Sequence, residues 1–312
     1  MGVPQSGTPT GPAPTTSPTL EPSTGEPSQG VPRPRTDRRK PRALHLFSGP
    51  TTRRDGLSRI FTQVGWECLD IDIVNVDAGL PKEEQDLSSD HLWSFLLQQV
   101  GEGAFDLVWM GTPCTTFSKA RQGPPGPAPL RSLEHIYGFP KGTVSQPDWE
   151  ATQLGNYFAI QSARMASVAL QRGVGFGIEN PAPWPGFPSI FLLPEFITLS
   201  QTPGVMAVDF DQCPFGAETA KPTRVLYALV DMQHLHGRCN HPKQTWHYTD
   251  WWGRPQSTYA AHRPLYNRRR ESGEPATKSA AAYPYALNKA IVRGAITRGR
   301  APVATSGPAL TT

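Results

Sequence analysis

Short apolar runs alternate with longer amphipathic segments through most of the chain. Residues 107–110 are all apolar and end at Gly111 and Pro113, which is typical of a strand buried on both faces. Upstream, the pattern predicts a strand over residues 44–47, a helix over about 55–64, and a second strand that ends in acidic residues. A strand, a helix and a strand in this order form a βαβ unit, so the pattern predicts an α/β fold.

Further elements follow the same pattern. The segment "DHLWSFLLQQV" is helix-like, with Asp90 as its expected N-cap, and Asp86 before it is placed at the end of a third strand. A strand over residues 174–181 ends in Glu179 and Asn180. The helix before that strand carries apolar residues at helical spacing, which we interpret as core: Leu154, Phe158, Met165 and Val168.

Chemically active residues follow several of these strands. Cys114 comes directly after the turn that closes residues 107–110, and Glu179 closes the later strand. Ligands of open α/β sheets bind at the carboxyl ends of the strands, so we expect both side chains at one edge. The alternative for Cys114 is a small buried hydrophobic residue, which is a common role of a free cysteine.

The first strand and its partner suggest a nucleotide-type site. Gly49 in the turn after residues 44–47 permits close backbone approach to a ligand, and Asp70 or Asp72 can accept hydrogen bonds from two ribose hydroxyls. The turn lacks the G-x-G-x-x-G pattern, so a tight strand–helix turn flanked by surface acids is the competing interpretation.

Composition divides the 312 residues into a folded part and two tails. Residues 1–42 hold ten prolines among Ser, Thr and Gly, and we expect them to be disordered, as we do residues 301–312. Six basic residues lie within residues 33–42, where a nucleic-acid contact, a nuclear import signal or a solvated linker is possible. No apolar run is long enough to predict a membrane-spanning helix, and the N-terminus lacks the apolar core of a secretory signal. Four cysteines are too few for a disulfide scaffold, so we expect the protein in a reducing compartment.

Four motifs in this order resemble those of the DNA cytosine-C5 methyltransferases. They are "FSG" at residues 47–49, "PCTTFS" at 113–118, "IENP" at 178–181, and a late strand entered by Arg224. The region "SAAAYPYALNKAIVRGAI" resembles the last motif of the family, which returns to the cofactor pocket. The chain departs from the family in its longer first loop with Arg53 and Arg54, and in Leu287-Asn288 where Gly-Asn is usual.

The resemblance implies a Rossmann-like S-adenosylmethionine (SAM)-dependent methyltransferase sheet with a small C-terminal target-recognition lobe. It implies that Cys114 attacks carbon 6 of cytosine, Glu179 acts as the acid at N3 and Arg224 holds O2. A neighbouring arginine and helix N-terminal amides would favour the thiolate of Cys114. The residues expected to bind SAM are Phe47, Ser48, Gly49, Asp70, Asp72, Asp86, Pro113 and Asn288.

The same resemblance divides the chain. It implies a SAM-binding catalytic domain over residues 43–230, a target-recognition region over 231–275 and a returning helix over 276–300. Residues 115–147 are expected to close over a base flipped out of DNA, with Arg121 and Arg131 either on phosphates or solvated.

The recognition region raises two questions of its own. Its Trp, Tyr, His and Arg residues suit stacking and phosphate contact, although aromatic core under a basic surface is the competing view. A structural zinc is conceivable for the cluster of Cys213, His236, Cys239 and His241, but without a C-x-x-C pair we assign no metal ligand, and a hydrogen-bonded turn is the alternative.

The sequence therefore predicts an enzyme that transfers a methyl group from SAM to carbon 5 of a flipped cytosine in DNA. An RNA cytosine-C5 methyltransferase and a non-catalytic nucleic-acid-binding module that retains the fold are the alternatives. We expect a monomer that binds DNA and no membrane, in the nucleus, or in the cytoplasm if the source is prokaryotic or viral.

Overall fold

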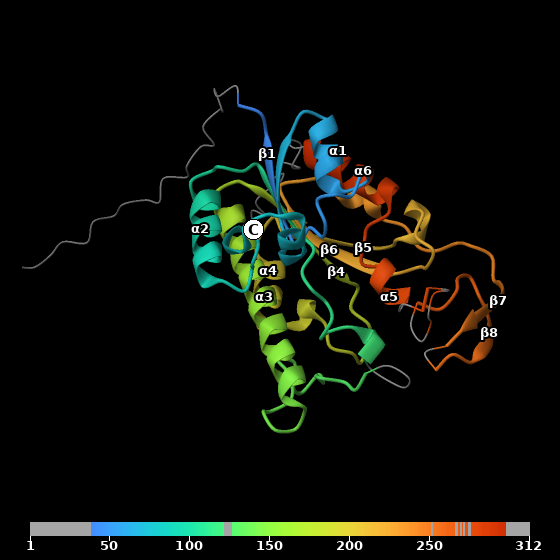
Figure 1. The fold of residues 1–312 in the computed structure, drawn as a ribbon. Helices are drawn as coiled ribbons and strands as arrows, with labels where there is room; N and C mark the ends of the chain where they lie inside the picture. The colour runs from blue at the N-terminus through green and yellow to red at the C-terminus, as the bar shows by residue number, and fades with distance from the viewer. Residues whose placement is uncertain are drawn as a thin grey trace, which may run out of the picture. The chain divides into compact units, whose positions relative to one another are not determined.

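A six-stranded mixed sheet forms the centre of the fold (Figure 1). The computed structural model describes residues 39–121, 127–250, 252–265, 268, 270, 272–273 and 276–297. Across the sheet the strands run in the order β2-β1-β3-β4-β6-β5. Their bounds are β1 Arg42–Leu46, β2 Glu67–Ile71, β3 Leu107–Met110, β4 Gly175–Pro181, β5 Met206–Asp211 and β6 Pro222–Ala228.

The direction and order of the strands show which edge of the sheet is suited to bind a ligand. Strands β2, β1, β3 and β4 are mutually parallel, and β6 is antiparallel to both β4 and β5. From β1 the chain passes to β2 on one side and then crosses to β3 on the other. This reversal of strand order is the topological switch point where open α/β sheets bind ligands. The predicted α/β class is confirmed.

Helices cover both faces of this sheet (Figure 1). On one face α1 (Leu57–Gln63) and α6 (Tyr285–Ile296) pack against each other and against a core that includes Trp109 and Tyr227. On the opposite face lie α2 (Asp90–Gly101), α3 (Gln146–Gln171) and α4 (Pro194–Gln201). Both faces of β3 are therefore buried, which explains its uniformly apolar sequence.

Shorter elements complete the described chain. A hairpin of β7 (Gln244–Thr249) and β8 (Pro255–Ala260) forms a separate two-stranded sheet, and α5 covers Ala276–Ser279. The 3-10 helices are η1 Ile73–Ala78, η2 Lys82–Glu84, η3 Lys119–Arg121, η4 Ile190–Leu192, η5 Cys213–Phe215 and η6 Gln233–Leu235. In the part of the chain that the structure describes, no helix combines the length and apolar character needed to cross a bilayer.

Two local predictions in the first half of the chain are wrong. Asp86 follows η2 in a turn, and no strand lies between β2 and β3 in the described range 39–121. Ser89, not Asp90, is the N-cap of α2, because its side chain accepts a hydrogen bond from the backbone N–H of Leu92. Asp90 is the first helical residue, and its carboxylate accepts a hydrogen bond from Tyr157.

The boundary between tail and folded chain lies earlier than predicted. Arg39 donates hydrogen bonds to the backbone carbonyls of Gly103 and Ala104, and the N–H of Arg42 donates to Asp106. Residues 39–42, which were expected in the disordered tail, are therefore held against the folded chain. Of the expected tails, residues 1–38 of the first (1–42) and all of the second (301–312) lie outside the described residues, as do residues 298–300.

Arg131 organises the long segment between β3 and α3. Its buried guanidinium donates hydrogen bonds to Thr116, Asn156 and two backbone carbonyls, and it lies 3.6 Å from the ring centroid of Phe117. Burial lowers the pKa of Arg131 to about 9. Arg121 is ion-paired with Asp148 at 2.9 Å. The prediction that Arg131 meets phosphates or is solvated is wrong, since its donors hold this segment to α3.

The close packing of β3 against β4 can be tested by substitution of a glycine. An alanine Cβ at Gly177 would overlap the ring of Trp109, which is fully buried. We expect Gly177→Ala to lower the free energy of unfolding by about 1–3 kcal/mol, because the ring has no room to move. Gly101→Ala is the matched control: it has open space at the end of α2, and we expect unchanged or slightly higher stability. Urea denaturation measures both, and equal stability of the two variants would contradict this packing.

Candidate active site

A cavity of about 800 Å³ lies at the carboxyl ends of β1, β2, β3 and β4. Its volume falls within the range of small-molecule and cofactor sites. Glu179 lines this cavity together with all eight residues predicted to bind a cofactor: Phe47, Ser48, Gly49, Asp70, Asp72, Asp86, Pro113 and Asn288. The structure therefore brings together residues separated by up to 241 positions, from Phe47 to Asn288.

The turn after β1 has an unusual backbone. Phe47 has a φ of 57° and Gly49 a φ of 68°, both in the left-handed region. A phenylalanine there costs about 1–2 kcal/mol, and the structure offsets this cost by holding the ring against Phe158, with 5.1 Å between ring centroids. Around Gly49 the space where a side chain would stand is open. The turn thus offers its backbone to the cavity.

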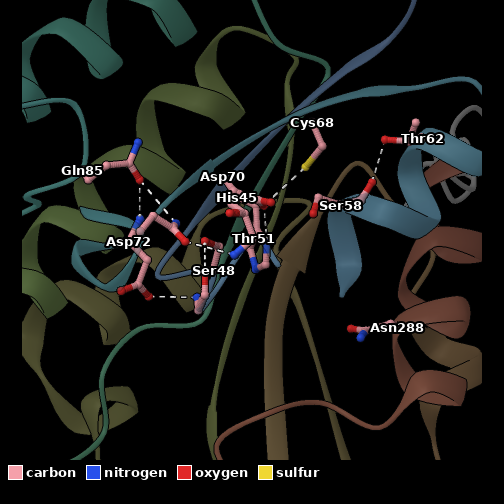
Figure 2. Close-up of polar contacts among 12 residues, drawn as sticks. His45, Ser48, Thr51, Ser58, Thr62, Cys68, Asp70, Asp72, Gln85 and Asn288 are labelled. Atoms are coloured by element: carbon pink, nitrogen blue, oxygen red, sulfur yellow. Dashed lines mark hydrogen bonds and ion pairs between the residues drawn. The ribbon is translucent and has the colours of Figure 1, made fainter. Parts of the chain in front are cut away.

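Asp72 holds this turn in place (Figure 2). One carboxylate oxygen accepts a hydrogen bond from the N–H of Gly49 at 2.9 Å, and the other accepts one from the N–H of Val74 at 3.1 Å. The N–H of Asp72 itself donates to Gln85. Both oxygens retain lone pairs for a further donor. Asp72 therefore positions Gly49 whether or not it also contacts a ligand.

Two other acids complete this side of the cavity. Asp70 lies beside His45 on the neighbouring strand, with 2.9 Å between Oδ1 and Nδ1 (Figure 2). Asp86 accepts hydrogen bonds from the backbone N–H and the hydroxyl of Ser88. The hydrogen bond from the Ser88 hydroxyl is the largest cause that lowers the pKa of Asp86. Asp86 is thus an ionised acceptor at neutral pH.

The C-terminal helix closes the cavity on the side opposite these acids. Asn288 of α6 is buried, and its Nδ2 donates to the carbonyl of Asp55 at 2.8 Å. Arg53 joins the same loop to the carbonyl of Tyr283. Among the described residues, the buried Oδ1 of Asn288 has no hydrogen-bond partner. An acceptor without a donor at the edge of a cavity is suited to a polar ligand.

The turn that carries Cys114 is fixed from two sides. The Nδ2 of Asn180 on β4 donates to the carbonyl of Thr112 at 2.7 Å, and the Thr112 hydroxyl is 2.9 Å from that of Ser162 on α3. Cys114 follows this anchored residue by two positions and is half-buried. Cys114 itself is not among the described residues that line the 800 Å³ cavity, but its neighbour Pro113 is.

Glu179 and Tyr283 form a pair next to this turn. The Tyr283 hydroxyl donates to one carboxylate oxygen of Glu179 at 3.0 Å. The other oxygen, Oε1, is buried and lacks a hydrogen-bond partner within the described part of the chain. A buried carboxyl oxygen without a partner is costly, so Oε1 is suited to form a hydrogen bond with a polar ligand group.

Charge links Cys114 to the same pair. Burial and the negative charge of Glu179 raise the pKa of the Cys114 thiol, while the positive charge of Lys221 opposes this rise. The pKa of Tyr283 is also raised, first by burial and then by the charge of Glu179. The expected arginine and helix N-terminus are replaced by Lys221 and a non-helical turn. Cys114 is therefore a thiol at neutral pH in this state.

Arg224 does not join this group. Its guanidinium forms a bidentate ion pair with Asp209 of β5, at 2.6 and 2.8 Å. Arg224 is paired across the sheet with Asn180, whereas Glu179 is paired with Val225. Directly paired residues share a face and successive residues alternate, so Arg224 and Glu179 point to opposite faces. Arg224 is not among the described residues that line the cavity, and its assignment to O2 binding stays a prediction.

Four residues at the site were missed or misread in the sequence. Tyr283 and Lys221 lie in irregular segments, where no periodic pattern marks a side chain as pointing inward. Lys221 has a φ of 40°, a left-handed conformation that no sequence signal predicted. Leu154 and Phe158 were interpreted as core, yet both line the cavity and Leu154 is exposed. Helical spacing identifies the apolar side of a helix but does not show that its end faces a cavity.

Comparison with known proteins adds little to this geometry. No model of a protein family and no curated protein matches the sequence. One similar solved structure is described as a DNA modification methyltransferase encoded within a prophage (E. coli). It is 14% identical, the match covers 67% of this chain and 58% of that chain, and the TM-score is 0.32. The protein thus spans less than two thirds of that chain, and so weak a likeness carries no argument about function.

The charges around Cys114 predict opposite effects of two substitutions on its alkylation by iodoacetamide. Glu179→Gln removes the negative charge that raises the pKa of Cys114, so we expect alkylation at neutral pH several-fold faster. Lys221→Met removes the opposing positive charge and should slow it. Peptide mass spectrometry measures the rate at each cysteine. Cys68, whose pKa is raised by burial and Asp70, is the internal control and should not respond. If the alkylation rate of Cys114 changed in the same direction in both variants, the assigned effects of the two charges would be contradicted.

Proposed function

We propose that the protein transfers a methyl group from SAM to carbon 5 of cytosine in DNA, through a covalent adduct with Cys114. The observation that carries this proposal is the electrostatic coupling of Cys114 to Glu179, whose Oε1 has no hydrogen-bond partner among the described residues, next to a cavity of cofactor size. A nucleophile and an acid side by side are what addition to a pyrimidine ring requires. The order of motifs that resembles the cytosine-C5 methyltransferases supports the same reaction.

The residues around the cavity fit SAM. The ionised Asp86 suits the adenine amine, Asp70 or Asp72 suits the ribose hydroxyls, and the exposed backbone at Gly49 allows close approach. The Oδ1 of Asn288, which has no hydrogen-bond partner in the described part of the chain, offers a further acceptor. When bound, SAM supplies an electrophilic methyl group on a positively charged sulfur.

Cys114 and Glu179 divide the activation of cytosine between them. The Cys114 thiolate forms a bond to carbon 6 while the electron pair of the 5,6 double bond moves to carbon 5. Glu179 donates a proton or a strong hydrogen bond to N3, which draws electron density away from carbon 6. After methylation, a water molecule accepts the proton on carbon 5, the electron pair of that C–H bond restores the 5,6 double bond, Cys114 leaves as a thiolate and the proton on N3 returns to Glu179.

The electrostatic link between the two side chains favours this division. The negative charge of Glu179 raises the pKa of Cys114, so a proton on Glu179 makes the thiolate easier to form. Transfer of one proton from Cys114 to Glu179 therefore produces both reactive forms at once. The Tyr283 hydroxyl, 3.0 Å from Glu179, holds the carboxyl group in place for this exchange.

Exposed aromatic and basic residues supply candidate contacts to nucleic acid. Trp252 and Tyr259 of the β7–β8 hairpin are 56% and 70% exposed, and Arg254 lies 4.5 Å from the ring centroid of Trp252. Nearer the Cys114 turn, Lys119 lies 3.5 Å from the ring centroid of the half-exposed Trp184. Aromatic rings stack on bases and cations pair with phosphates, so both groups suit a DNA strand from which a base is flipped.

DNA that contains 5-fluorocytosine tests the adduct directly. Fluorine cannot leave as a cation, so with SAM the wild-type protein should stall as a denaturation-resistant complex, and peptide mapping should place the base on Cys114. Cys114→Ser should form no complex and reduce methylation of normal DNA by at least about a thousandfold. Glu179→Gln should slow methylation by about a hundredfold or more, because an amide cannot deliver the proton.

Tyr283→Phe is the matched control for Glu179, since it removes only the hydrogen bond that positions the carboxyl group. We expect a smaller loss of rate and a shifted pH profile. Methylation by Cys114→Ser would overturn the assignment of the nucleophile. Methyl transfer to RNA alone would redirect the proposal to an RNA substrate, and transfer to neither polymer would refute an enzymatic role.

A further inference from the structure

Outside the cavity, two cysteines and two histidines converge where the β7–β8 hairpin joins the main sheet. They are Cys213, Cys239, His241 and His262, and one ligand atom from each lies within 4.8 Å of the others. The Sγ of Cys239 is 3.1 Å from Nε2 of His262 and 3.6 Å from Nδ1 of His241. Tetrahedral zinc with two sulfur and two nitrogen ligands requires separations of about 3.4–3.8 Å. The four side chains therefore need only small shifts to surround one ion.

We propose that these four residues bind a structural zinc ion. Two thiolates and two imidazoles match the ligand preference of Zn²⁺ and disfavour Mg²⁺ or Ca²⁺, which take oxygen ligands. Four protein ligands close the coordination shell, which is typical of a structural zinc site rather than a catalytic one. This proposal does not depend on the methyl-transfer reaction.

Surrounding contacts orient the ligands as a zinc site requires. The Nδ1 of His262 lies 3.1 Å from the carbonyl of Glu218, a contact that fixes the ring with Nε2 toward Cys239. A ligating histidine usually donates its other ring N–H in this way. The N–H of Cys239 donates to Asp211 at 2.7 Å, which ties the cysteine loop to the end of β5.

The position of the site explains what a metal would stabilise. Cys213 follows β5 of the main sheet, Cys239 and His241 precede β7, and His262 follows β8. The strands of the hairpin are mostly exposed and bury little apolar surface. A two-stranded hairpin is at best marginally stable alone in water. One zinc ion would fasten both ends of the hairpin to the main sheet and so fix its exposed Trp252 and Tyr259.

The cluster considered in the sequence, for which no metal ligand was assigned, shares three of these four residues and has His236 in place of His262. His236 is exposed at the end of η6 and is outside the group that the structure brings together. His262 takes its place because the hairpin returns the chain to the same point 21 residues after His241. Pairing of β7 with β8 brings these positions together, and spacing along the chain alone could not show it.

Metal analysis of the full-length protein tests the proposal. We expect about one zinc ion per chain in the wild type by mass spectrometry of the metal, and less than about a tenth of that in Cys239→Ser and His262→Gln. His236→Gln is the matched control and should retain the metal. Chelation should lower the melting temperature by about 5 °C or more, and added Zn²⁺ should restore it.

If a variant fails to fold, a second measurement on the wild-type protein still tests whether the four residues bind a metal ion. Chelated wild-type protein titrated with Co²⁺ should develop the thiolate-to-metal absorption bands of a tetrahedral site, saturating at about one ion per chain. Wild-type protein that holds no zinc and gives no such bands would overturn the proposal. So would a disulfide between Cys213 and Cys239 in freshly purified protein, or zinc retained by both Cys239→Ser and His262→Gln.

Discussion

The carboxyl ends of β1 and β3 approach so closely that a side chain at position 111 would be tightly confined. A Cβ at Gly111 would lie 3.3 Å from the carbonyl oxygen of Phe47 and 3.3 Å from the hydroxyl oxygen of Tyr283. A larger residue would separate the first turn from the cysteine turn, or displace Tyr283 from Glu179. The cofactor side and the reacting side of the candidate site therefore share this one point of contact.

The C-terminal segment depends on the same contact. Tyr283 reaches Glu179 because α6 packs on α1 through buried residues such as Leu287 and Ile291. Asn288 then ties α6 to the loop before α1. Residues from both ends of the described chain thus complete one cavity, which exists only when the whole sheet and its helices have formed. Loss of α6 would remove Asn288 from the cavity and leave Tyr283, two residues before the helix, without its support.

Much of the cavity could be predicted because parallel strands bring their carboxyl ends together. Apolar runs located the strands, and the residues that follow each run, such as Gly49, Asp72 and Glu179, had to meet at one edge. Arg224 was assigned from the family resemblance and not from this rule, and it lies on β6, which is antiparallel to β4. In that strand a shift of one residue changes the face, and an ion pair with Asp209 on β5 decides where the guanidinium points.

Buried polar side chains were the second kind of feature that the sequence did not predict. Arg131 looked like a surface residue because its four acceptors come from segments that only the folded chain assembles. His262 and Tyr283 were hidden for the same reason, since each gains its role from a partner more than twenty positions away. Local pattern predicts elements and their edges, whereas tertiary contacts select which polar side chain reaches a site.

A crystal structure of the protein with S-adenosylhomocysteine, the product of methyl donation by SAM, tests the central claim most directly. We predict that the ligand occupies the 800 Å³ cavity, with its ribose against Asp70 or Asp72 and its adenine against Asp86. Binding at another place, or no binding at saturating concentration with and without DNA, would show that this cavity is not a SAM site.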